Sequence, residues 1–540
     1  TSKRLNRLTS TTSAWSPFRI PVFRMLWTAT LISNIGTWMH DIGASWLMIT
    51  LSPTPVMVAL VQTATTLPIF LLAIPAGALA DIVDRRSYLI VVQLWLALVA
   101  GLLGFMTLTG ITSAWSLVTL TFAMGIGSAM MMPAWAAITP ELVPRNELQS
   151  AIALNSLGIN AARTIGPALA GIIVSYAGAG AVFALNALTY CLVIFTLILW
   201  RREAPISELP SERFFSALRS GFRFARHAPD LQAAIIRGFG FFLFTSASWA
   251  LLPLLVKRLE NGGPQTFGIL VASIGTGAVI GAFLLPKLRE KISRDMLVAL
   301  ATIVYALTMF ALATVEQLIF LCLAMGVSGI AWISVLSSLQ VAAQMALPNW
   351  VRSRGLAIFM AIFMGSMATG SLLWGKVAEM TSISEALMTA ATGAMIAALL
   401  TWRWHIGGIE KADLTPSMHW PAPMVHDGVT HDRGPVLVTI QYVVQDDKTS
   451  EFLTMIRELS KRRRRDGAFA WGVFEHAEKP NHFIESFSVD SWLEHLRQHE
   501  RVTHADRILQ AQLRTLLING SKPVVTHYVA PESTTGRTKR

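Results

Sequence analysis

Two charged residues lie inside long apolar stretches of this sequence, where a charge is costly and usually has a function. Asp41 follows His40 within the apolar stretch 25–50, and Arg163 lies within the stretch 151–177. An acid whose proton affinity changes with its surroundings can take up and release a proton, and a nearby arginine stabilises its charged form. We therefore predict that Asp41 and Arg163 pair, directly or through water, for proton coupling, with His40 as a further candidate. The alternative is that Asp41 is a solvated acid at the outer mouth of the protein.

Other polar residues of the apolar stretches are candidates either for alternative proton carriers or for the lining of a substrate cavity. Glu316 and Glu379 lie near the outer ends of their stretches and are the next candidates for a proton carrier, whereas we expect Arg237 to reach the membrane surface with its long side chain. Polar and aromatic side chains can line a cavity for an amphipathic substrate, although aromatic residues also pack in cores or lie at membrane interfaces. The cavity candidates are Asn34, Trp38, Gln62, Asn155, Asn160, Trp249, Trp332 and Gln340.

These side chains have to be positioned by helices that cross a membrane. The chain is 53% hydrophobic and only 14% charged, whereas a soluble protein has about 25% charged residues. Twelve stretches satisfy the requirement of about 20 mainly apolar residues for a membrane span. They are 25–50, 54–80, 88–110, 115–138, 151–177, 180–200, 231–256, 265–286, 295–315, 318–342, 355–378 and 384–404.

The charges indicate the environment of these spans and their orientation. The net charge of +12 comes mostly from loops between apolar stretches, which favours a lipid bilayer and not nucleic acid as the partner. Lys and Arg concentrate at the N-terminus and in alternate loops, whereas the opposite loops hold only Lys257, Arg258 and Lys376. The positive-inside rule then predicts that both termini are cytoplasmic. Cys191 and Cys322 lie within spans, so no disulfide framework is expected, and the first span is too long for a cleaved signal peptide.

The chain also repeats itself. Gly77 and Gly281, Pro144 and Pro348, and Gly166 and Gly370 are separated by one constant offset, and "MGIG" and "MGVS" follow at nearly the same spacing. Two parallel six-helix halves of an all-α membrane transporter explain this pattern. We divide the chain into a cytoplasmic N-terminus (1–24), a first half (25–200), a cytoplasmic linker (201–230), a second half (231–404), a second linker (405–434), a soluble domain (435–531) and a tail (532–540).

A compact charged sequence, "GALADIVDRR" at residues 77–86, connects the second and third spans. It resembles the signature loop of the major facilitator superfamily, which has the pattern Gly-x-x-x-Asp-Arg-x-Gly-Arg-Arg. Gly77, Asp81, Arg85 and Arg86 match, whereas Ile82 and Asp84 depart from the pattern. The resemblance implies a conformational latch in which Asp81 faces the end of the eleventh helix. Arg85 and Arg86 are then expected to reach Glu141. The alternative is a loop that is charged only because it is cytoplasmic.

The fifth span carries a stripe of small residues, including Gly158 and Gly166, followed by Pro167. Small residues four apart allow another helix to approach closely. The stretch resembles the antiporter motif of drug and metabolite exporters, although Gly171 stands alone where that motif has paired glycines. Both tight packing and a role in coupling remain open.

Taken together, "PAWAAITPELVPRNELQSAIALNS", the Arg163 helix and "SVDSWLEHLRQHERVTHADR" resemble the bacterial transmembrane secretion effector group, which is similar to the enterobactin exporter. The resemblance implies a secondary transporter of the bacterial cytoplasmic membrane. It would export small amphipathic molecules of siderophore, drug or metabolite type by proton antiport and alternating access. The alternative is a membrane-anchored enzyme or sensor whose C-terminal domain is active. We favour the transporter, expect no enzymatic activity, and find no cofactor or nucleotide-binding motif.

The soluble domain is predicted from alternating strand patterns and amphipathic helices. The order βαββαβ, ending in one long helix over 491–519 and a strand over 523–530, predicts a ferredoxin-like α+β fold in the cytoplasm. The domain is also a candidate for homodimer formation. His495 and His499 are four residues apart, a spacing that suits metal ligands, with His504 further on. Because no third ligand can be placed, we expect a solvated helix face and no metal.

Overall fold

The structure, a computed structural model, describes residues 15–144, 147–200, 214–348, 351–406, 433–518 and 523–531. These residues form two compact units. One contains most of the long apolar helices, and the other combines a C-terminal sheet with helix α6 (Phe214–His227). Helix α6 lies within the predicted linker 201–230, so part of this linker is helical. Most of the predicted N-terminus, most of the second linker and the tail 532–540 lie outside the described residues.

The first half contains five helices, four of which begin at clear sequence signals. Proline occupies the first turn of α1 and α2, where its missing N–H is not needed. Asp84 caps α3, and Ser113 forms a capping box with Ser116 at the start of α4. The helices are α1 (Pro21–Leu51), α2 (Pro55–Ile82), α3 (Arg85–Leu108), α4 (Ala114–Leu142) and α5 (Leu148–Leu199), preceded by a 3-10 turn (Ser16–Arg19).

Helix α5 is 52 residues long and contains a break at Gly178, whose φ of 77° favours glycine. This break falls between the two spans predicted over 151–177 and 180–200. Leu108, at the end of α3, lies against Gly180 just after the break. The segments before and after Gly178 are therefore two helices that meet at a kink.

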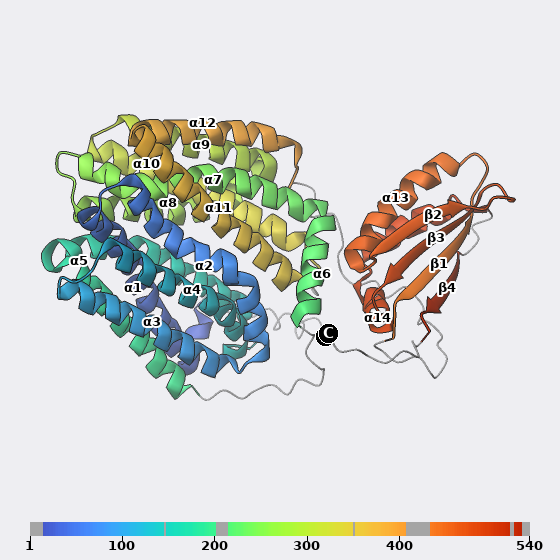
Figure 1. Cartoon of the computed structure of the whole chain (residues 1–540), viewed down its shortest axis with the longest axis horizontal. Helices are drawn as coiled ribbons and strands as arrows, with labels where there is room; N and C mark the ends of the chain where they lie inside the picture. The colour runs from blue at the N-terminus through green and yellow to red at the C-terminus, as the bar shows by residue number, and fades with distance from the viewer. Residues whose placement is uncertain are drawn as a thin grey trace, which may run out of the picture. The chain divides into compact units, whose positions relative to one another are not determined.

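The second half contains six long helices, which Figure 1 shows grouped beside those of the first half. Among the described residues, ten helices are long and apolar enough to cross a membrane. Helix α1 is not one of these ten, and α5 is counted once. The helices of the second half are α7 (Pro229–Arg258), α8 (Pro264–Lys291), α9 (Arg294–Thr314), α10 (Leu318–Met345), α11 (Arg352–Met380) and α12 (Ile383–Leu400), followed by a 3-10 turn (Thr401–Arg403).

The C-terminal domain contains an antiparallel sheet with the strand order β2-β3-β1-β4. Alternate residues of β1 point into a core that helix α13 covers, and Figure 1 shows α13 and α14 on the same face of the sheet. The elements are β1 (Val436–Val443), α13 (Thr449–Asp466), β2 (Ala470–Glu475), β3 (His482–Val489), α14 (Trp492–Arg501), α15 (His504–Arg514) and β4 (Val524–Val529).

The single long helix predicted over 491–519 is wrong. The backbone of Val502 is extended, and Thr503 then starts α15 with a capping box to Asp506. The capping motif lies within an otherwise continuous amphipathic pattern. The spacing of the apolar residues alone therefore did not show that one helix ends and another begins here.

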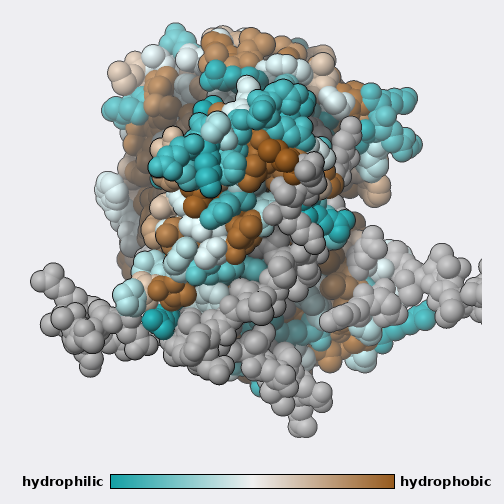
Figure 2. All heavy atoms as spheres, turned by 90° about the vertical axis from the view of Figure 1, so that its right-hand side faces the viewer, coloured by the Kyte–Doolittle hydropathy of each residue, from teal (hydrophilic) through white to brown (hydrophobic). Residues whose placement is uncertain are grey.

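The surface of the C-terminal domain differs from that of the apolar helices. Figure 2 shows hydrophilic side chains interspersed with apolar ones on the side that faces the viewer. The apolar helices of the other unit instead expose many large apolar side chains, such as Leu98 and Phe105 of α3. Such exposure is typical of a lipid-facing surface.

Candidate functional site

Trp38 brings the predicted coupling residues together. Trp38 and Asp41 are three residues apart in α1 and therefore share a helix face. The guanidinium carbon of Arg163 lies 5.6 Å from the centre of the Trp38 ring, a cation–π contact. Among the described residues no ion pair joins Arg163 to Asp41, and Nε of Arg163 is buried without a hydrogen-bond partner. Arg163 thus reaches the Asp41 face of α1 through an aromatic ring, one turn from the carboxylate.

Small residues of α5 allow α1 to approach this closely. A methyl group built on Gly166 would lie 2.6 Å from Cβ of Trp38, and one on Gly158 would lie 3.4 Å from the ring of Trp27. The first distance leaves no room for a side chain. The small-residue stripe therefore packs α5 against α1. Its role in coupling remains a prediction.

The same segment of α5 also contacts the second half. A methyl group built on Gly268 of α8 would lie 2.4 Å from the carbonyl oxygen of Pro167. One built on Gly275 would lie 2.8 Å from the carbonyl oxygen of Arg163. The backbone of Arg163 is therefore part of the contact between the halves, while its side chain lies over a residue of α1.

Three of the predicted cavity residues form a row of aromatic rings across the two halves. Trp38 of α1 lies 6.5 Å from Trp249 of α7, which in turn lies 5.7 Å from Trp332 of α10. Trp332 is buried against Tyr305 of α9 and Phe363 of α11. The row brings apolar surface and indole N–H groups next to the Arg163 and Asp41 region, a combination that suits an amphipathic ligand.

The remaining polar cavity candidates have local hydrogen-bond partners or are at least partly exposed. Asn155 donates to the hydroxyl of Thr139 at 3.1 Å, and Asn160 donates to a carbonyl of its own helix. Gln340 is exposed, and Asn34 and Gln62 are half-buried.

The alternative proton carriers differ in their burial and in their partners. His40 is buried against Phe183, with ring centres 4.6 Å apart, and both of its nitrogens lack a partner. Glu316 is exposed. Glu379 is also exposed, and it pairs with Lys376 one turn away.

The charged sequence 77–86 holds helix ends of the first half together. Asp84 accepts a hydrogen bond from the amide of Ser87, which explains an acid where the superfamily pattern has glycine. Arg85 forms the predicted ion pair with Glu141, at 2.7 Å. A methyl group built on Gly77 would have no atom within 4 Å, so this conformation has no close packing there. The side chain of Asp81 lies outside the described residues.

The prediction that Arg86 reaches Glu141 is wrong. Arg86 instead donates to the carbonyl oxygens of Leu197 and Ile198, both at 2.8 Å. These carbonyls lack partners within the helix because α5 ends at Leu199. A cation at a helix C-terminus is favourable. This partner could not be predicted from the sequence because it is far away in the chain.

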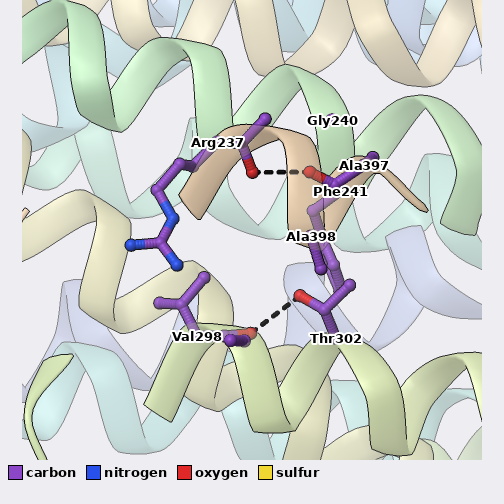
Figure 3. Close-up of a pocket in the computed structure, with 9 residues that line it drawn as sticks. Arg237, Gly240, Phe241, Val298, Thr302, Ala397 and Ala398 are labelled. Carbon is purple, nitrogen blue, oxygen red and sulfur yellow. Dashed lines mark hydrogen bonds between the residues drawn. The ribbon is translucent and has the colours of Figure 1, made fainter. Parts of the chain in front are cut away.

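The expectation that the side chain of Arg237 reaches the membrane surface is wrong. It is 3% exposed and forms an ion pair with Asp295 of α9, to whose backbone oxygen it also donates at 3.0 Å. Figure 3 shows Arg237 beside a narrow pocket between α7, α9 and α12, with Val298 and Thr302 on the opposite wall. Both acid and base were visible in the sequence, but their pairing depends on the packing of α7 against α9.

One group of described residues is suited to a metal ion, and it lies in the C-terminal domain. His495, His499 and His527 bring one ring nitrogen each to within 4.8 Å of one another. His495 is buried, so the expectation of a solvated helix face is wrong at this residue. The third histidine is His527 of β4 and not His504.

The sequence profile of the transmembrane secretion effector family matches residues 12–535. The staphyloferrin A transporter of Staphylococcus aureus is 25% identical over 368 residues, which cover 67% of this chain and 90% of that protein. The enterobactin exporter EntS of Salmonella choleraesuis is 25% identical over 386 residues, covering 70% and 91%.

Solved transporter structures share the fold of the helical part. A POT family transporter in complex with a thioalcohol conjugated peptide has a TM-score of 0.59 at 14% identity, and covers 70% of this chain and 94% of that one. A bacterial homolog of the human lysosomal transporter Spinster, in an inward-facing and unoccupied conformation, has a TM-score of 0.53 at 17% identity, covering 72% and 95%. The chain is a transporter and not an enzyme, and it belongs to the transmembrane secretion effector family of the major facilitator superfamily.

Proposed function

We propose that this protein exports siderophore-like small molecules across the bacterial cytoplasmic membrane by proton antiport. The observation that carries the proposal is the row Trp38, Trp249 and Trp332, which crosses both halves next to Arg163 and Asp41. Siderophores combine rings or alkyl chains with many oxygen atoms. Indole rings bind the apolar part of such a molecule, and an arginine binds its carboxylate or catecholate oxygens. Two relatives, a staphyloferrin A transporter and an enterobactin exporter, support this substrate class.

The contact between α5 and α8 supports alternating access. The closest approaches involve glycine and backbone atoms near Gly171 and Pro264. Toward the other end of α5, Ile152 and Leu157 are exposed. We infer that the two halves close at the Gly171 end in this conformation and rock about the Trp38 region. The binding site then opens toward the end that carries the sequence 77–86.

Asp41 is the proposed proton carrier. It lies one turn from Trp38, and Arg163 lies over that ring. Asp41 and Arg163 belong to the same half, so the change must come from the Arg163 side chain. Rocking separates Gly275 of α8 from the Arg163 backbone, and we infer that the side chain then shifts relative to Asp41. A closer Arg163 stabilises the carboxylate, and a more distant one favours its protonation. Substrate that binds to Arg163 competes with Asp41 for the same charge, which links substrate binding to proton uptake.

The remaining architecture is proposed on the same basis. Helix α1 and the two segments of α5 on either side of Gly178 complete a set of twelve spans in two parallel halves. The strand order β2-β3-β1-β4, in a domain of βαββααβ order, supports a ferredoxin-like fold for residues 435–531. Both termini are proposed to be cytoplasmic, and the C-terminal domain remains a candidate for homodimer formation.

An export assay in cells tests the proposal. Cells that express the protein are loaded with a panel of catecholate, carboxylate and hydroxamate compounds and with unrelated drugs, with and without a proton uncoupler. We expect faster loss of at least one siderophore class, abolished by the uncoupler. Selective export of unrelated drugs alone would contradict the substrate class, and export that the uncoupler does not change would contradict proton coupling.

A further inference from the structure

Three histidines of the C-terminal domain lie close together although they come from distant parts of the chain. His495 and His499 belong to α14, and His527 belongs to β4. Nε2 of His495 lies 3.2 Å from Nε2 of His499, and one nitrogen of His527 completes a group within 4.8 Å. His495 is 1% exposed, whereas His499 and His527 are half-buried, so the group is reached from solvent on one side.

The fold fixes this arrangement from both sides. His495 and His499 are four residues apart and therefore lie on one face of α14. His527 pairs with Val438, a core residue of β1, so its side chain points to the same face of the sheet as the core. Trp492, one turn before His495, packs against His495 and His527 with ring centres 5.3 Å and 6.0 Å apart. A buried tryptophan thus holds two of the three rings in place.

We propose that His495, His499 and His527 form a binding site for a divalent transition metal ion such as zinc. Imidazole nitrogens are good ligands for such ions. Nitrogens at ~2.0–2.1 Å from a tetrahedral ion are ~3.3–3.4 Å apart, and the two helix histidines already have this spacing. A shift of roughly 1.5 Å brings the third nitrogen to the same distance. Three histidines leave the fourth position of the metal open to water or to a further ligand.

A hydrogen bond between His495 and His499 alone accounts less well for the surroundings. Nδ1 of His495 and both polar atoms of the Gln498 amide group are buried, and none of the three has a hydrogen-bond partner among the described residues. A metal on Nε2 requires that Nδ1 carries the proton, and the Gln498 oxygen is the acceptor at hand. Histidine ligands usually have such a partner on their other nitrogen.

Zinc titration of the full-length protein tests the site. The protein is purified in detergent with an affinity tag that contains no histidine, stripped with a chelator and titrated calorimetrically with Zn²⁺. We expect one tight site per chain. His499→Gln and His527→Gln should weaken this site by more than about 100-fold, and Gln498→Ala, which alters only the supporting partner, by about 10–100-fold. His476→Gln, an exposed histidine of the same domain, is the matched control and should leave the site unchanged.

A cobalt spectrum of the unmutated protein gives a second measurement that does not depend on whether the variants fold. Co²⁺ in the proposed site should give the intense visible absorption of a tetrahedral complex. One equivalent of Zn²⁺ should displace the Co²⁺ and abolish this absorption. Absence of both this spectrum and a tight zinc site in the wild type would overturn the proposal. So would an unchanged zinc affinity in folded His499→Gln and His527→Gln proteins, with folding checked by circular dichroism.

Discussion

Replacing Gly268 by alanine is expected to shift the conformational equilibrium of the transporter. The new methyl group would lie 2.4 Å from the Pro167 carbonyl oxygen and 3.0 Å from Cα of Gly171. Both are backbone atoms of α5, which cannot rotate away as a side chain does. Overpacking of this kind costs about 1–3 kcal/mol. Alanine also favours the helix by about 1 kcal/mol over glycine, but this gain is the same in both conformations and cancels.

The substitution therefore destabilises only the conformation in which α5 and α8 are in contact. A bias of about 1–3 kcal/mol changes the ratio of the two conformations by roughly 5–150-fold. Spin labels on cysteines at Ile111 and Glu260 measure this change, because both positions are exposed and lie on different halves near the closed end. Cys191 and Cys322 are first replaced by serine. The Gly268→Ala protein should show a larger fraction of long distances in pulsed electron paramagnetic resonance.

Gly101→Ala in α3 is the matched control, since its methyl group would find its nearest neighbour, Cβ of Ala187, at an ordinary contact distance of 3.9 Å. It should leave the distance distribution unchanged. Gly275→Ala, with a predicted approach of 2.8 Å to the Arg163 carbonyl, should act in the same direction as Gly268→Ala. If Gly268→Ala and Gly101→Ala gave the same distances and the same transport rate, the inferred closure through α5 and α8 would be refuted.

Three further substitutions test other parts of the account. Asp41→Asn should abolish uphill export driven by a pH gradient while leaving substrate exchange measurable; export at the wild-type rate would exclude Asp41 as the carrier. Glu141→Gln removes the partner of Arg85 and should slow transport and lower the free energy of unfolding by roughly 1 kcal/mol, measured by thermal unfolding in detergent. Burial opposes the ionisation of Asp506, but neighbouring cations and the capping hydrogen bonds outweigh it and lower its pKa to about 2. The ionised carboxylate of Asp506 therefore adds about 2–3 kcal/mol to the free energy of unfolding above pH ~4, and this stabilisation is lost as the pH falls toward ~2. Asp506→Asn should remove this part of the acid sensitivity, measured by unfolding the protein at a series of pH values. Burial raises the pKa of Asp466, so this residue makes the pH dependence of stability run in the opposite direction. The effect of Asp506 is therefore measured as the difference in stability between the wild type and Asp506→Asn at each pH.

Much of the helical part could be predicted because hydrophobicity and length suffice to locate a membrane helix. The stretch 54–80 corresponds to α2 (Pro55–Ile82), and the predicted break near 178 coincides with Gly178. The strands of the C-terminal domain follow from their alternating pattern in the same way.

Pairings between distant residues could not be predicted from one sequence. Arg86 donates to carbonyls more than a hundred residues away, and Arg237 pairs with a residue on another helix. The spacing of His495 and His499 was visible, but His527 joins them only because β4 lies next to β1 in the sheet. Local patterns show which face of an element a residue occupies, whereas the partner on that face depends on tertiary packing.

The most direct test of the central claim is transport by the purified protein in liposomes. Vesicles with a defined pH gradient and no other energy source are supplied with a radiolabelled siderophore of the class found in cells. We expect uphill accumulation that requires the pH gradient, is accompanied by a counterflow of protons, and is lost in Asp41→Asn but retained in Gly101→Ala. Accumulation that is independent of the pH gradient, or no transport of any siderophore class by folded protein, would contradict proton-coupled siderophore export.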